Sequence, residues 1–261
     1  MAYAEPSSTE VAKTGGGDEA GRYCEAIERY ERGSQEWRER CEKITKIYLD
    51  QHRTVASPRR FALLWSNIET LKPAVYARLP QAVVSRRFKD ADPIGRKAGE
   101  VLERCINTSF DLYNLDECLR GGRDDRLLSA RGTAWLRYEA QVEGDQAEGE
   151  KVCFDYVHWS DFGYSLDRTW GEVKLVWRRV YMTRKAVEKR WDEERAKKLN
   201  YEFRPALISR YTANTGDKEA SEPQAMIHEI WDKEKRQTVW LAKEEKFVLE
   251  SGNPPLDLRN F

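Results

Sequence analysis

The sequence has few of the residues that usually carry enzymatic chemistry. It holds only three histidines, His52, His158 and His228, and neither a G-x-S-x-G elbow nor a G-x-x-x-x-G-K-[ST] phosphate loop. His158 stands between Asp155 and Asp161, which suggests a metal-dependent nuclease as one hypothesis. Residues three apart on a strand point to opposite faces, however, so these ligands should diverge. The sequence therefore predicts no enzyme, no metal site and no cofactor.

Other absences narrow the class further. The five cysteines form no C-x-x-C pair, which argues against a zinc ribbon, and their odd number fits a reducing compartment. Basic and acidic residues balance at 45 each, so contact with nucleic acid needs a local patch. No apolar run reaches the roughly 18 residues that cross a bilayer, so no membrane partner is expected.

What the sequence does contain is aromatic side chains, at 11%, and charge, at 34%. The first favours a packed core and the second a large solvated or interfacial surface. The patterns predict an α+β fold, with long N-terminal helices followed by a β-rich, mainly antiparallel portion with one inserted helix. We expect a disordered tail over 1–21, a helical region with one short strand over 22–132, and a β-rich region over 133–261.

A long helix is predicted over 22–50, and Gly33-Ser34 should bend or split it. Its larger side chains recur at alternating steps of four and three residues, which is a heptad-like seam. The members that matter most are Tyr23, Ile27, Tyr30 and Trp37. Two interpretations stay open: the seam packs on its own domain, or it meets a neighbouring subunit.

The stretch 58–105 reads as helix, break, short strand, turn and helix. Pro80 should stop the first helix, which Pro73 should kink, and a strand is predicted over 81–88. Asp92 and Pro93 predict the start of the next helix, as cap and first residue. That helix is predicted to carry six residues on one stripe: Val101, Cys105, Thr108, Leu112, Leu115 and Leu119. Gly121-Gly122 should interrupt it before a short helix over 123–131.

The second half alternates between apolar and polar residues. The segments 133–140 and 151–159 predict a hairpin with a long exposed loop, and 173–182 a third strand. Thr183 should cap one helix over 184–199, with Val187 and Trp191 on its core side. A meander is predicted over 226–231, 237–241 and 247–249, after a loop over 210–223.

Two arginine-rich segments, 78–97 and 120–137, carry a local excess of positive charge. They favour two interpretations: contacts with nucleic acid or with neighbouring subunits, or ion pairs with nearby acids. The candidate contact residues are Arg86, Arg87, Lys89, Arg120, Arg123 and Arg126. A nucleic-acid-binding module is the alternative function that these segments suggest.

Four collinear segments carry a family resemblance. They are SNIETLKPAVYARLPQAVVSRRFKDADPIGRKAGEVLER at 66–104, GGRDDRLLSARGTAWLRY at 121–138, VHWSDFGYSLDRTWGEVKLVWRRVY at 157–181 and IHEIWDKEKRQTVWL at 227–241. The pattern resembles the N-terminal wing region of phage portal proteins, of the P22-like family of short-tailed phages and prophages. In that family the chain continues into a stem and a clip, so we read this sequence as a fragment or a shortened relative.

The resemblance implies a structural role. A portal is a ring of about twelve copies at one capsid vertex, through which double-stranded DNA is packaged and ejected. The implied partners are the chain itself, the terminase, the capsid protein and the head-completion or tail proteins. The implied location is the virion, after assembly in the host cytoplasm. Without stem and clip, we expect the chain alone to be monomeric or weakly associated.

Overall fold

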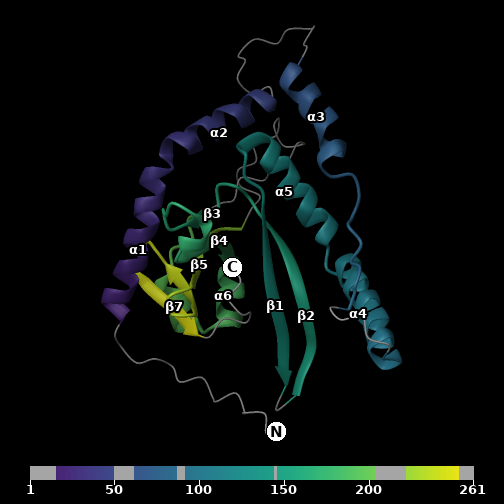
Figure 1. Cartoon of the computed structure of the whole chain (residues 1–261). Coiled ribbons are helices and arrows are strands. Elements are labelled where there is room, and N and C mark those ends of the chain that lie inside the picture. Colours follow the sequence, from purple (N-terminus) through teal and green to yellow (C-terminus); the bar gives the residue numbers. More distant parts are fainter. Residues whose placement is uncertain (1–15, 50–61, 87–91, 144–145, 204–221, 253–261) are drawn as a thin grey trace. The chain divides into compact units, whose positions relative to one another are not determined.

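The computed structural model describes residues 16–49, 62–86, 92–143, 146–203 and 222–252 (Figure 1). The α+β prediction is confirmed, because helices lead the described chain and antiparallel sheets dominate its later part. The chain divides into two compact units: unit 1 runs up to Gln35 and resumes at Asp161, and unit 2 spans Glu36 to Ser160. This division differs from the predicted boundary at 132, because the first helix belongs with the last strands. No helix in the described residues is long and apolar enough to cross a membrane.

Unit 1 is built on a five-stranded antiparallel sheet in which every strand pairs with its neighbour along the chain. A short 3-10 turn lies between the first two strands. The strands, in sheet order, are β3 (Phe162–Tyr164), β4 (Leu175–Thr183), β5 (Gln224–Asp232), β6 (Gln237–Ala242) and β7 (Phe247–Gly252). The predicted third strand and meander are therefore confirmed. The predicted loop at 210–223 lies almost wholly outside the described residues.

One face of this sheet is covered by α1 (Gly16–Gly33). Tyr23, Ile27 and Tyr30 are each 1% exposed and pack on apolar residues of β4, β5 and β6. Of the two interpretations of the seam, packing on its own domain is therefore confirmed for these three residues, and the contact with a neighbouring subunit is wrong for them. The predicted tail also needs correction, because α1 begins at Gly16; residues 1–15 lie outside the described chain.

The opposite face is covered by α6 (Arg184–Arg190) and α7 (Glu193–Lys198). Val187 is fully buried against the sheet, as predicted, and Thr183 caps α6 by accepting from the Ala186 amide at 3.4 Å. One helix was predicted here, but two form. Asp192 accepts a hydrogen bond from the Arg195 amide at 2.6 Å and so starts a second helix.

Unit 2 holds the remaining helices and a two-stranded antiparallel hairpin. These elements are α2 (Gln35–Tyr48), α3 (Leu63–Val75), α4 (Pro93–Leu112), α5 (Leu115–Ser129), β1 (Thr133–Glu143) and β2 (Gln146–Val157). The split of the first predicted helix at Gly33-Ser34 is confirmed. Trp37, the fourth seam residue, packs edge-on against Trp159 with ring centroids 5.5 Å apart. It therefore also packs within its own unit.

The hairpin was predicted with a long loop, but its strands continue almost to the tip, and only 144–145 separate them. The helical break predicted at Gly121-Gly122 is also wrong, since α5 runs through both glycines. The break falls instead at Asn114, which lies in the left-handed region with φ of 57°. Asparagine tolerates that region better than most residues.

The strand predicted over 81–88 does not form in its described part, 81–86. Side chains of α4 satisfy its backbone instead: Asn107 Oδ1 accepts from the Ala82 amide at 2.8 Å, and Glu103 accepts from the Val84 amide at 2.9 Å. These two residues lie one turn apart on α4 and replace the partners that a neighbouring strand would offer. The start of α4 is as predicted: the Asp92 carboxylate accepts hydrogen bonds from the amides of Ile94 and Gly95, and Pro93 is the first residue of the helix.

Candidate interaction sites

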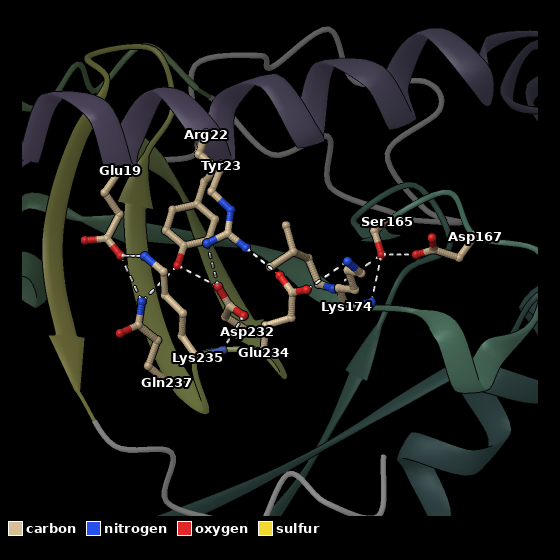
Figure 2. A network of polar contacts seen from close by, with 11 residues as sticks. Glu19, Arg22, Tyr23, Ser165, Asp167, Lys174, Asp232, Glu234, Lys235 and Gln237 are labelled. Carbon is tan, nitrogen blue, oxygen red and sulfur yellow. Dashed lines mark hydrogen bonds and ion pairs between the residues drawn. The ribbon is translucent and has the colours of Figure 1, made fainter.

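A buried polar network joins α1 to the turn between β5 and β6 (Figure 2). At its centre Asp232, the last residue of β5, is 0% exposed. Its carboxylate accepts from the Tyr23 hydroxyl at 2.9 Å and from the Lys235 amide at 3.0 Å, and it lies 3.5 Å from the Arg22 guanidinium. One carboxylate therefore holds both the turn and the covering helix.

Ion pairs at the edge of this polar network add further contacts between α1 and the sheet; we call the whole network the polar latch. Glu19 accepts from the Lys235 ammonium at 2.6 Å, and this hydrogen bond lowers the pKa of Glu19. Glu234 is the common partner of Arg22, at 3.0 Å, and of Lys174, at 2.8 Å. Burial raises the pKa of Tyr23 further above its usual value, so its hydroxyl stays protonated and keeps donating to Asp232.

An open depression of about 360 Å³ lies beside this network, between α1 and the β3–β4 connection. Its cations already have partners: Arg22 and Lys174 pair with Glu234, and Arg29 pairs with Glu25 at 3.2 Å. Matched charges of this kind fit a structural contact better than a site for an anionic ligand.

A second polar group lies on the same sheet face, near the other end of α1. Glu31 accepts from Arg179 at 2.6 Å and from Lys243. His228 is fully buried, and among the described residues neither of its ring nitrogens has a hydrogen-bond partner. Burial, followed by the charges of Arg179 and Lys243, lowers the pKa of His228 from 6.5 to about 3.

His228 therefore predicts an acid-sensitive fold. Because the folded state holds His228 neutral, protons bind more readily to the unfolded state below its pKa of 6.5. The free energy of unfolding is therefore unaffected by His228 above pH 6.5 and decreases as the pH falls from 6.5 toward 3. Between pH 6.5 and 4 the wild type should lose up to about 3 kcal/mol more than His228→Leu, at about 1.4 kcal/mol per pH unit. Urea unfolding across this pH range measures the difference.

The half-buried His158 provides the matched control. His158→Gln should lose as much unfolding free energy between pH 6.5 and 4 as the wild type does. If the wild type and His228→Leu lose equal unfolding free energy over this pH range, His228 is not the source of the acid sensitivity.

The structure gives three of the six predicted basic contact residues partners within the chain. Arg120 pairs with Asp116 at 2.8 Å, and Arg123 lies 2.7 Å from Asp124 and donates to the Tyr76 carbonyl at 3.1 Å. Arg86 donates to the Asp92 carbonyl at 2.9 Å, and Arg126 is exposed. Arg87 and Lys89 lie outside the described residues. The described contacts favour the ion-pair interpretation over a phosphate-binding patch.

The residues of the nuclease hypothesis are held by separate partners. Asp155 accepts from Arg137 at 2.9 Å, Asp161 accepts from Tyr181 at 2.8 Å, and His158 Nδ1 lies 2.7 Å from the Ser160 hydroxyl. Within the described ranges, no three side chains of the metal-binding types gather into a cluster. The hypothesis thus gains no support.

The largest feature that the sequence patterns did not predict is an exposed apolar surface on unit 2. Helix α4 is 20 residues long, and none of them is buried. Large apolar side chains that are about half exposed or more lie on two helices: Leu63, Trp65, Leu71 and Val75 on α3, and Ile94, Val101, Leu102 and Leu112 on α4. The first four members of the predicted stripe are therefore exposed; of the rest, Leu115 is buried and Leu119 half-buried at the start of α5.

The inner side of α4 explains why this stripe faces outward. Glu103 and Asn107, on the opposite side of the helix, are the residues that hold the extended segment 81–86. Gly99 lies on that side too, where an added Cβ would sit 3.9 Å from the Val84 side chain. The small and polar side of α4 is thus used inside the unit, and its apolar side remains exposed.

No model of a protein family matches the chain, and no curated protein matches it either.

Proposed function

We propose that the chain is a structural component of a bacteriophage portal ring, at the capsid vertex through which the genome is packaged and ejected. The collinear resemblance over 66–104, 121–138, 157–181 and 227–241 supports this assignment. The polar groups described above support a structural role, because they latch helices onto a sheet rather than line a catalytic cleft.

The observation that carries the proposal is that large apolar side chains are exposed on α3 and, along one stripe, on α4. Proteins that act as monomers rarely leave large contiguous apolar patches exposed, and such patches usually mark interfaces. A 20-residue helix with no buried residue is a strong case. Covering this surface with protein is what assembly into a larger particle would do.

Ring closure makes a further demand that the chain can meet. A ring needs a heterologous interface, in which two different patches of each subunit complement each other. Exposed apolar side chains on α3 and on α4 offer two such patches within one unit. The nucleic-acid-binding alternative is less favoured, because Arg120 and Arg123 spend their charge on neighbouring acids.

Quantitative mass spectrometry of purified phage particles tests the proposal. In particles whose genome encodes the chain, we expect about twelve copies per particle, as one ring requires. The coat protein, counted in the same sample, is the internal standard. Absence from the particles, or a copy number close to that of the coat protein, would contradict a portal role.

A further inference from the structure

The exposed side of α4 carries a regular pattern that goes beyond the proposed ring. Six positions on one stripe recur at alternating steps of four and three residues: Ile94, Ala98, Val101, Cys105, Thr108 and Leu112. We call these residues the α4 seam. All six are exposed. This spacing is that of the a and d positions of a coiled coil, so the seam is shaped to receive another helix.

We propose that the occupant is α4 of a second copy of this chain, packed antiparallel about a two-fold axis near Glu103. In that register each seam residue meets a seam residue of the second copy: Ile94 faces Leu112, Ala98 faces Thr108, and Val101 faces Cys105. The small side chains of the middle layers let the two helix backbones approach closely. The large apolar residues then close both ends of the contact.

The charges beside the seam select the antiparallel orientation. Lys97 and Asp111 are both exposed and flank the same side of the seam, two heptads apart. In the antiparallel pair Lys97 lies beside Asp111 of the second copy, and the two-fold axis repeats this contact. A parallel pair would place Lys97 beside the uncharged Leu102 and would form no ion pair there. Antiparallel helix dipoles also attract each other.

One charge opposes the pairing and sets its strength. Arg104, on the same flank, meets Arg104 of the second copy close to the axis. Together with the small central layers, this repulsion predicts a weak pair. A weak pair fits the expectation that the isolated chain associates only weakly. It is a two-fold contact, so it would form in place of a heterologous ring contact through the same side of α4, and not together with it.

Sedimentation velocity of the full chain, in reducing buffer at about 1–300 µM, tests the pairing. The wild type should shift from the 30.5 kDa monomer toward twice that mass as concentration rises. Lys97→Glu and Asp111→Lys should each raise the dimer Kd about tenfold, because each creates two like-charge contacts. The double variant should return to within about threefold of the wild type, since its charges are only exchanged.

Arg96→Glu is the matched control, because Arg96 lies off the seam and undergoes the same charge change without altering the Kd. Arg104→Gln should tighten the dimer. Circular dichroism checks that every variant keeps its fold.

A chain that stays monomeric throughout overturns the inference, as does a double variant no better than the single ones. Neither result bears on the particle count, so the portal proposal and this pairing fail independently.

Discussion

Replacing Glu229 with alanine is expected to lower the free energy of unfolding by about 3–5 kcal/mol. Glu229 on β5 lies directly opposite Arg178 on β4, and the two side chains are 5% and 8% exposed. Their charged groups are 2.6 Å apart, and Trp231 also donates to this carboxylate at 3.2 Å. The substitution would take away from a buried guanidinium the carboxylate that lies 2.6 Å from it, which is far more costly than losing an exposed pair.

Urea unfolding followed by circular dichroism measures this loss. The matched control is Glu193→Ala, which removes an exposed ion pair to Lys197 and should cost less than about 1 kcal/mol. The double variant Arg178→Met with Glu229→Leu should be more stable than Glu229→Ala, because it removes both buried charges of the pair. If Glu229→Ala costs no more than the control, the pair does not hold the sheet as described.

Replacing Gly132 with alanine is expected to destabilise unit 2 by about 3 kcal/mol or more. An added Cβ would sit 1.9 Å from the Gly122 carbonyl oxygen and 2.6 Å from its carbon. Both atoms belong to the backbone of α5, so relief requires the helix and the start of β1 to move apart. This contact fixes how α5 lies on the hairpin.

Gly122→Ala is the matched control on the other side of the same contact. There an added Cβ meets nothing closer than 3.8 Å, and alanine favours a helix over glycine. Gly122→Ala should therefore leave stability unchanged or raise it by up to about 1 kcal/mol. Thermal unfolding of both variants compares them directly, and equal melting temperatures would refute the close contact.

Local chemistry predicted much of the fold. Asp92 and Thr183 were identified as helix caps because their side chains suit free amides, and both accept the expected hydrogen bonds. Alternating residues identified the hairpin and the meander, because period two places one side of a strand in a core. The break at Gly33-Ser34 followed from low helix propensity.

The predictions that were wrong share a different cause. A sequence pattern shows which residues lie on one face of an element, but it does not show what that face contacts. The spacing predicted the stripe through Val101 and Leu112, but the spacing did not show that these side chains would be exposed. The strand at 81–86 did not form because Glu103 and Asn107 of the following helix, α4, satisfy its backbone. Neither outcome is encoded in the local sequence.

The polar latch of unit 1 was equally out of reach. Tyr23 and Asp232 are separated by more than 200 positions in the chain, and their contact depends on α1 joining the last strands. Tyr23 was correctly seen as part of an apolar seam, but its hydroxyl partner could not be named. A pattern with period 3.5 says nothing about which carboxylate lies beneath the helix.

The central claim is that the exposed apolar surface of unit 2 contacts protein. Site-specific photocrosslinking in phage-producing cells tests it most directly, with a photoreactive residue at Leu102 and, as control, at Arg29, whose side chain is 68% exposed on unit 1. The account predicts abundant covalent adducts to protein from position 102 and few from position 29. Equally sparse adducts from both positions would contradict it.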